Sequence, residues 1–197
     1  MIQPNGYWTL ETPFATIVGL YSNVSGELDD ADKDARIQRD WLTEELNTAP
    51  ADKCLLVAVH HPIYSLGKHG GTKAIEHALE HAMKASDRMP DAVFTGHDHC
   101  YQRFIRKREG WRIPFLVVGA GGFAGYDDMT KVKYSLAPPE DVRLKAYEDE
   151  RPGFLRVTIT HDELTGEYFT VPKPGSENKP AKLRDEFTLD LRTHRLV

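Results

Sequence analysis

Two short apolar runs, each followed directly by histidines, constrain the fold of this chain more than any other feature. Residues 54–59 (Cys-Leu-Leu-Val-Ala-Val) precede the motif His60-His61-Pro62, and residues 92–94 (Ala-Val-Phe) precede Thr95-Gly96-His97-Asp98-His99. Both runs are too short for a helix, and their unbroken apolar character is typical of strands buried on both faces of a sheet. Parallel strands end at one edge of their sheet, where open α/β folds keep their binding sites. The sequence therefore predicts a cluster of histidines at that edge.

Helical patterns fill the stretches between these strands. Residues 14–21 form another β-prone run, and residues 35–46 follow with a one-sided apolar stripe, made by Ile37, Trp41, Leu42 and Leu46. The clearest helix begins after Thr72, a suitable N-cap, and its apolar residues recur three and four positions apart, at Ile75, Ala78, Leu79, Ala82 and Met83. This order of elements predicts a βαβαβ unit.

The second half of the chain has a different pattern. Residues 115–118 predict a strand, whereas residues 126–151 are charged, lack periodicity and indicate a long surface loop, a candidate lid over the site. Residues 154–160 alternate apolar and polar side chains and predict a hairpin with residues 168–171, and residues 187–191 predict a last strand. The expected fold class is therefore α/β, with βαβαβ followed by an antiparallel β-meander.

Length and composition exclude several classes of function. With 197 residues the chain has the size of one domain, and its net charge of −5 gives no electrostatic case for binding nucleic acid or an acidic membrane. No apolar stretch approaches the ~20 residues that span a bilayer. Two cysteines are too few for a disulfide framework and favour free thiols in a reducing compartment such as the cytoplasm. Any targeting signal would precede residue 1, so the compartment stays open.

The histidines offer the chemistry of a metal site. His60, His97 and His99 are neutral nitrogen donors suited to zinc, iron or manganese. His69 lies between glycines on a loop after His60, which suits proton transfer better than ligation. Asp98 stands between two candidate ligands, where a hydrogen bond accepted by its carboxylate fixes the loop or the tautomer of a ligand.

Other candidates have simpler interpretations. His77 and His81 lie four positions apart in the predicted helix, but they share its polar face with Glu76 and Glu80 and are expected in solvent. Tyr101 and Arg103 have two interpretations: either they touch the substrate, or they pack beside the histidine loop. The glycines of 119–122 form a structural turn, since no lysine follows to cradle a phosphate.

Taken together, the motifs resemble those of a known superfamily. The segments that carry the likeness are Val59-His60-His61-Pro62-Ile63-Tyr64-Ser65, Gly96-His97-Asp98-His99, Tyr101-Gln102-Arg103 and Gly119-Ala120-Gly121-Gly122. In this order and at this spacing they resemble the last two motifs of the calcineurin-like metallophosphoesterases, in the purple acid phosphatase-like branch. The resemblance runs from about Tyr7 to Leu191 and implies half of a two-sheet sandwich with flanking helices.

The resemblance also implies a function and a role for each site residue. It implies a dinuclear centre of iron, zinc or manganese that hydrolyses phosphate esters, in a small molecule or a phosphoprotein. His60 and His97 match ligands of one metal, and His99 matches a ligand of the other. His69 matches a residue that contacts the phosphate or protonates the leaving oxygen. His61 falls where the superfamily is variable.

The first three motifs of that superfamily, Asp-x-His, Gly-Asp-x-x-Asp or -Tyr and Gly-Asn-His, do not occur in these 197 residues. Residues 1–197 are therefore expected to be the C-terminal portion of a metallophosphoesterase domain. By itself this chain is expected to hold little or no metal and to turn over poorly. The alternative function is a catalytically incomplete module that binds metal weakly or binds a partner. A homodimer is expected through the surface that such a portion leaves open.

Overall fold

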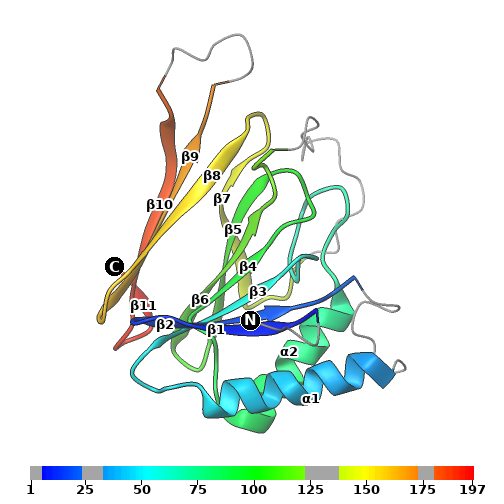
Figure 1. Cartoon of the computed structure of the whole chain (residues 1–197). Helices are drawn as coiled ribbons and strands as arrows, with labels where there is room; N and C mark the ends of the chain where they lie inside the picture. The colour runs from blue at the N-terminus through cyan, green and yellow to red at the C-terminus, as the bar shows by residue number, and fades with distance from the viewer. Residues whose placement is uncertain (1–5, 24–32, 123–137, 173–179) are drawn as a thin grey trace.

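The described part of the chain folds into two β-sheets and two helices, arranged as three layers (Figure 1). The computed structural model describes residues 6–23, 33–122, 138–172 and 180–197. The elements in chain order are β1 (Trp8–Glu11), β2 (Ala15–Leu20), α1 (Lys33–Thr48), β3 (Cys54–Val59), α2 (Lys73–Ser86), β4 (Ala92–Thr95), β5 (Tyr101–Arg108), β6 (Trp111–Val118), β7 (Val142–Glu148), β8 (Gly153–Ile159), β9 (Glu163–Thr170), β10 (Lys182–Asp190) and β11 (Arg195–Leu196). None of the described helices is long and apolar enough to cross a membrane.

The larger sheet has seven strands in the order β1-β2-β3-β4-β6-β5-β7. Its strands β2, β3, β4 and β6 run parallel, and α1 and α2 connect the first three of them. The remaining strands, β1, β5 and β7, pair antiparallel with their neighbours. This topology confirms the predicted α/β class and its βαβαβ unit.

Strand β3 shows why the apolar runs are strands of a central layer. Leu55, Val57 and Val59 belong to a core shared with α1 and α2, whereas Cys54 and Leu56 belong to a second core shared with the smaller sheet. Successive side chains of a strand point to opposite faces, so a strand covered on both faces must be apolar throughout. The helices thus lie on one face of the large sheet and the small sheet on the other.

The smaller sheet is antiparallel, in the order β11-β10-β9-β8. It confirms the predicted hairpin, with Gly153 opposite Thr170 and Ile159 opposite Leu164, and the meander continues through β10. Strand β10 begins at Lys182, earlier than the predicted start at residue 187, because its first residues pair with the end of β9 although they are polar.

Residues 126–151 are not a continuous surface loop, and that prediction was wrong. Strand β7 occupies residues 142–148 and pairs with β5. Its apolar residues Val142, Leu144 and Ala146 alternate with Arg143 and Lys145, which is the period of a strand with one buried face. The candidate lid, in residues 126–137, lies outside the described residues.

Strands β1 and β5 were not predicted from the sequence, and the buried face of α1 differs from the predicted apolar stripe. Strand β5 leads away from the His97 loop and turns back into β6, which starts at Trp111 rather than at residue 115. In α1 the buried residues include Gln38. Its amide oxygen accepts a hydrogen bond from the Tyr21 N–H at 2.7 Å, and its Nε2 donates one to the Tyr21 carbonyl at 2.9 Å. Ile37, predicted in the stripe, is 48% exposed.

Candidate metal centre

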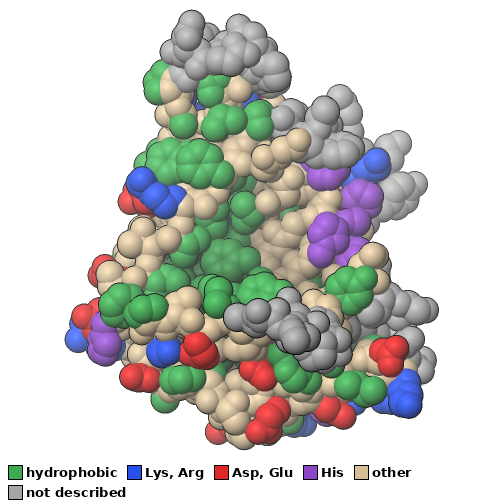
Figure 2. All heavy atoms as spheres, viewed as in Figure 1, with side chains coloured by type: hydrophobic (Ala, Val, Ile, Leu, Met, Phe, Trp, Pro, Cys, Tyr) green, Lys and Arg blue, Asp and Glu red, His purple; other side chains and the backbone are tan. Residues whose placement is uncertain are grey.

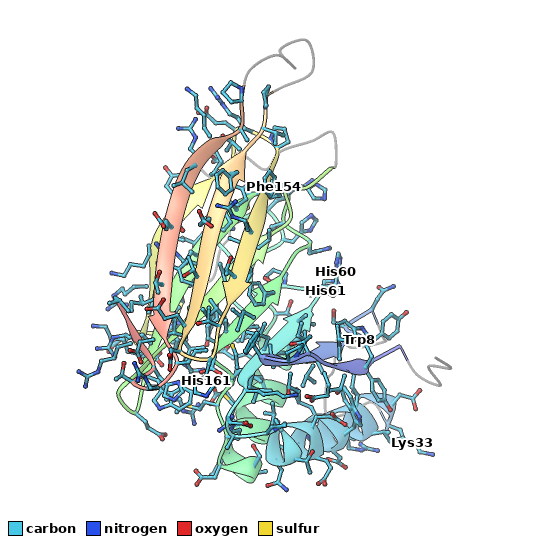
Figure 3. The ribbon with its side chains drawn as sticks, turned by 60° about the vertical axis from the view of Figure 1, so that its left-hand side comes forward. Trp8, Lys33, His60, His61, Phe154 and His161 are labelled. Carbon is cyan, nitrogen blue, oxygen red and sulfur yellow. The ribbon has the colours of Figure 1, made fainter. Side chains whose placement is uncertain are left out.

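The ends of β3 and β4 place the histidines at one edge of the large sheet. His60 and His61 follow the last residue of β3, and His97 follows β4 after Gly96. Figure 3 shows His60 and His61 at the end of β3. The two loops are joined directly, because the Gly96 N–H donates to the His60 carbonyl at 2.9 Å. The predicted meeting of the two strand ends is therefore built into the backbone.

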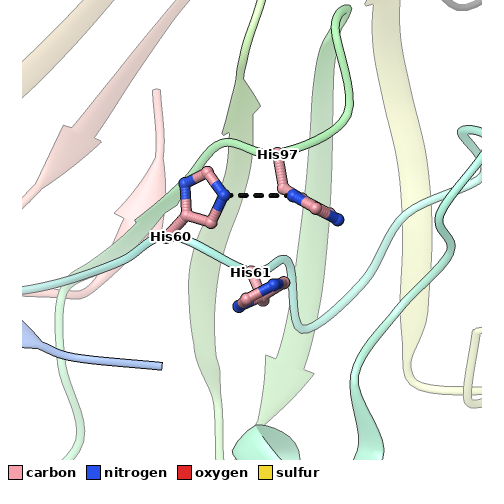
Figure 4. A group of neighbouring side chains, drawn as sticks. All are labelled: His60, His61 and His97. Atoms are coloured by element: carbon pink, nitrogen blue, oxygen red, sulfur yellow. Dashed lines mark hydrogen bonds between the residues drawn. The ribbon is translucent and has the colours of Figure 1, made fainter. Parts of the chain in front are cut away.

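Three imidazoles come together at this edge (Figure 4). The Nε2 atom of His60 lies 3.0 Å from Nδ1 of His97, and the ligand atoms of His60, His61 and His97 all lie within 4.8 Å of one another. Two nitrogens that each bind one ion at ~2.0–2.1 Å are themselves about 3 Å apart. The spacing of His60 and His97 thus fits two ligands of a common ion.

His97 has a backbone conformation that is unusual for a residue with a side chain. Its φ of +66° lies in the left-handed region. A non-glycine residue held there costs some conformational energy, and such residues gather at functional sites, where the surrounding structure determines them. In this loop the conformation turns the chain so that the His97 ring faces His60, His61 and His69, with ring centroids 4.9, 4.4 and 4.2 Å away.

His61 is held by the end of a third strand. The Ser22 hydroxyl, fully buried just after β2, lies 2.9 Å from His61 Nδ1 and accepts a hydrogen bond from the His61 backbone N–H at 3.2 Å. A hydrogen bond to one ring nitrogen fixes both the orientation and the tautomer of an imidazole. His61, which the sequence reading set aside, therefore stands in the cluster in a defined pose.

The surroundings favour neutral imidazoles. Partial burial lowers the pKa of His60 below its usual value, and the nearby rings of His61 and His99 lower it further. Burial likewise lowers the pKa of His97, helped by His61, His69 and His60 and opposed by the carboxylate of Asp98. Because a metal binds the unprotonated nitrogen, both shifts favour the ligand form at neutral pH.

Beneath the rings, the fully buried carboxylate of Asp98 ties two loops together. It accepts hydrogen bonds from the Ser65 hydroxyl and, at 2.8 Å, from the backbone N–H of His69. Gln102, also fully buried, donates to Ser65 Oγ at 2.9 Å and accepts from the Leu66 N–H at 2.8 Å. The loop that carries His69 is thereby anchored to the loop that carries His97.

Two glycines allow this close packing around Asp98. A Cβ atom added at Gly67 would lie 2.5 Å from Asp98 Cγ, and one added at Gly119 would lie 1.9 Å from the Asp98 carbonyl oxygen. Both distances are far below van der Waals contact, so both positions require a residue without a side chain. The turn predicted at residues 119–122 therefore has a specific task, which is to let the end of β6 approach Asp98.

The remaining predicted site residues lie at the border of the cluster. His69, His61 and His97 line an open hollow of about 420 Å³ together with the 70–74 segment, so the three rings face one space. His99 is not in the group of mutually close ligand atoms, although it is near enough to His60 to affect its pKa. Among the described residues that group is His60, His61 and His97, so His61, which was given no role from the sequence, joins the two histidines expected to bind one metal.

Other sequence candidates are accounted for elsewhere. His77 and His81 are exposed on α2, as predicted, but Glu76 of the same helix is buried and accepts from the Tyr64 hydroxyl at 3.0 Å. Arg103 forms a two-pronged ion pair with Asp185 at 2.7 Å, and the Tyr101 hydroxyl donates to the same carboxylate. Arg103 and Tyr101 thus join the two sheets, so the packing interpretation holds for them.

Sequence reasoning missed Ser22, Ser65 and Gln102. Ser65 and Gln102 lie inside the motifs quoted for the resemblance, which was the available signal, but their partners are 33 to 37 residues away in the chain. Ser22 carries no local signal, since its contact with His61 spans 39 residues. Contacts of this kind depend on the sheet order, which a single sequence does not display.

Comparisons with known proteins point in one direction. No protein-family model matches the chain. The human tartrate-resistant acid phosphatase type 5 is 31% identical over 135 residues, which are 68% of this chain and 39% of that protein. Purple acid phosphatase 17 of Arabidopsis thaliana is 33% identical over 116 residues, 59% of this chain and 31% of that protein.

Among solved structures, the purple acid phosphatase PPD1 from yellow lupin (Lupinus luteus) superimposes with a TM-score of 0.67. The match covers 96% of this chain and 34% of that one, at 15% sequence identity, and shows a shared fold. The chain spans less than two fifths of the length of these curated relatives.

Proposed function

This chain is related to the purple acid phosphatases of the metallophosphoesterase superfamily, and on that premise we propose that it supplies histidine ligands to a metal centre that hydrolyses phosphate esters. The observation that carries the proposal is the 3.0 Å approach of His60 Nε2 to His97 Nδ1, with His61 in the same group. These residues come from two separate strand ends, and the pKa of both His60 and His97 is lowered.

The three imidazole ligands suit a transition-metal ion that is neither very hard nor very soft. Neutral imidazoles bind zinc, iron and manganese, and His60, His61 and His97 would hold one such ion. When bound, the ion acts as a Lewis acid toward a phosphoryl oxygen and lowers the pKa of a water molecule. His99, two residues beyond His97, is the proposed ligand of a second ion in a dinuclear centre.

His69 has a different proposed role. Its backbone N–H donates to the buried Asp98, and its ring lies 4.2 Å from that of His97, beside which it lines the hollow. A phosphate ester in that hollow would lie beside the His69 ring. We assign His69 to contact the phosphate or to donate a proton to the leaving oxygen, and Asp98 to hold the loop that positions it.

Charge limits what this chain holds by itself. Among the described residues, the group of possible ligands contains no carboxylate, and the Asp98 carboxylate is engaged by Ser65 and His69. Two cations bound close together repel each other, and neutral ligands do not offset that repulsion. We therefore propose that residues 1–197 alone hold one ion and bind a second weakly, and that hydrolysis by this chain alone is slow.

The test is elemental analysis and calorimetric titration of the purified chain with zinc, manganese and iron. At most about one ion per chain should bind, and His97→Ala should abolish binding, whereas the matched control His161→Ala, an exposed histidine in a turn, should leave it unchanged. Release of nitrophenol from nitrophenyl phosphate is then measured with the ion present. Binding that survives His97→Ala, or a rate that does not depend on added metal, would refute the proposal.

The alternative function, partner binding, rests on an apolar groove between the sheets. Strand β8 is the outer strand of the small sheet, and its Leu155, Val157 and Ile159 are half-buried toward the large sheet. Figure 2 shows this hollow lined by hydrophobic side chains and bordered on one side by histidines. The large sheet also carries an open depression of about 280 Å³, whose lining includes Trp8, Phe94 and His60. We propose that a second copy of the chain covers the groove, because an apolar hollow next to an open strand edge drives association.

A further inference from the structure

A second hollow lies at the opposite end of β3 from the histidine cluster. It has a volume of about 400 Å³, and Cys54, the first residue of β3, lines it. His60 follows the last residue of the same strand, so six residues separate the two places, about 20 Å at the rise of a β-strand. The hollow is therefore separate from the histidine cluster, and it is also separate from the apolar groove between the sheets.

Basic side chains from four separate segments line this hollow. They come from the loop before β3, from the residues after α2, and from the two turns that close the small sheet: Lys53, Arg88, His161, Arg192 and His194. Two carboxylates, those of Asp52 and Asp91, line it as well. Segments this far apart in the chain meet here because the small sheet packs over the start of β3.

Most of the charged groups that line this hollow already have a partner of opposite charge or a hydrogen bond, and Arg88 has the weakest contacts among them. Asp91 is buried and engaged, since it accepts from the Leu55 N–H at 2.8 Å and lies 2.9 Å from His194 Nδ1. Lys53 pairs with Glu11 at 2.8 Å. Arg192 lies 3.5 Å from an Asp162 carboxylate, but its side chain is 72% exposed, so that pair is weak.

Arg88 is under-satisfied for a half-buried cation. One guanidinium nitrogen donates to the Pro50 carbonyl at a long 3.5 Å, and its buried Nε has no hydrogen-bond partner. Buried polar groups nearly always have partners, and an exception calls for a specific explanation such as a bound ion. The guanidinium group presents a planar set of donors that matches a carboxylate or phosphate group.

His194 is a second unusual residue in the same hollow. Its φ of +52° lies in the left-handed region, which a side chain disfavours. Three contacts keep it there: its ring stacks on Trp111 at 3.2 Å, its Nδ1 contacts Asp91, and its carbonyl accepts from the Arg112 N–H at 2.8 Å. Residues held in such a conformation by their surroundings gather at binding sites.

We propose that this hollow binds a small metabolite through an oxyanion, a phosphate or a carboxylate group, held by Arg88 and Arg192 beside the His194 ring. Its volume is at the lower end for small-molecule sites, which limits the ligand to a compact one. Arg88 lines the hollow with a guanidinium group whose contact to the Pro50 carbonyl is long, and the exposed Arg192 lines it as well. This site is independent of the proposed phosphoesterase centre.

The experiment uses the stacked tryptophan as a reporter. The indole N–H signals of Trp8, Trp41 and Trp111 are followed by nuclear magnetic resonance in the presence of EDTA, and the Trp111→Phe variant assigns the third. Inorganic phosphate and succinate are titrated separately, with sodium chloride at the same ionic strength as the reference. The Trp111 signal should shift and saturate with phosphate, with succinate or with both, and the more effective probe identifies the group.

Substitutions locate the binding. Arg88→Gln and Arg192→Gln should each weaken binding by about tenfold, the change expected from one charge-assisted hydrogen bond. Arg156→Gln, which removes an exposed arginine paired with Glu167 on the small sheet, should leave the titration unchanged, and so should His60→Ala. Arg192 is largely exposed, so its variant remains informative if Arg88→Gln does not fold.

Three results would overturn this proposal. One is a Trp111 signal that follows sodium chloride as closely as phosphate and succinate. Another is a folded Arg192→Gln chain that binds like the original. A titration lost in His60→Ala but kept in both arginine variants would likewise place the anion at the histidine cluster and remove the second site.

Discussion

Replacing Gln102 by alanine tests whether the buried network positions the His69 loop. The Gln102 amide donates to Ser65 Oγ at 2.9 Å and to Cys100 Sγ at 3.1 Å, and it accepts from the Leu66 N–H at 2.8 Å. The substitution removes all three bonds at a position with no exposed surface. The Leu66 N–H is left without this acceptor, in a place that water does not reach readily.

The expected cost follows from these contacts. An unsatisfied buried donor costs about 1–3 kcal/mol, and the space left by the missing amide adds to it. We therefore expect the free energy of unfolding to fall by about 3 kcal/mol, and for a chain of this size that lowers Tm by roughly 6–12 °C. Amide hydrogen exchange should speed up over residues 65–70, because the link from Gln102 through Ser65 to Asp98 is broken.

Gln38→Ala is the matched control. Gln38 is also buried and also makes two bonds to backbone, those of Tyr21, but it lies on α1 and contacts neither histidine loop. Urea unfolding gives the stability of both variants, and exchange measured by mass spectrometry gives the local opening. If Gln102→Ala costs less than about 1 kcal/mol, or if Gln38→Ala loosens residues 65–70 to the same degree, the network does not position that loop.

Three further predictions concern other parts of the molecule. Gly119→Ala should destabilise the fold by about 1–3 kcal/mol in thermal melts, because its Cβ would lie 1.9 Å from the Asp98 carbonyl oxygen, whereas Gly122→Ala has open space and should be neutral. Burial, reinforced by the neighbouring carboxylate of Asp91, raises the pKa of the Cys54 thiol, so this thiol should resist Ellman's reagent at neutral pH until the chain is denatured; rapid labelling of the folded chain would contradict its burial. Light scattering should show a dimer that Val157→Lys converts to monomer, and a clean monomer of the original chain at high concentration would count against the groove as an interface.

Local pattern alone determined the central layer and the histidine edge. A strand buried on both faces needs apolar residues at every position, and β3 and β4 carry that signal together with the histidines at their ends. The spacing of three and four in α2 is equally local, and it correctly separated the buried face from the exposed His77 and His81. Such features depend on residues within one element, so a single sequence displays them.

Weaker local patterns were harder to read. Strand β7 alternates as a strand should, but its charged residues resemble those of a loop, and only its pairing with β5 identifies it as a strand. The polar start of β10 was missed for the same reason, since its pairing with β9 rather than its composition makes it a strand. In both cases hydrogen bonds to a neighbouring strand override a weak intrinsic preference.

The make-up of the candidate site was decided by the tertiary structure. His61 joins His60 and His97 because Ser22, at the end of another strand, holds its ring, and Asp98 holds His69 through a bond between two loops. The far hollow around Arg88 likewise exists because the small sheet packs over the start of β3. Each of these contacts joins residues that are distant in the chain. Their meeting depends on strand order and register, which the whole fold sets and which no local pattern encodes.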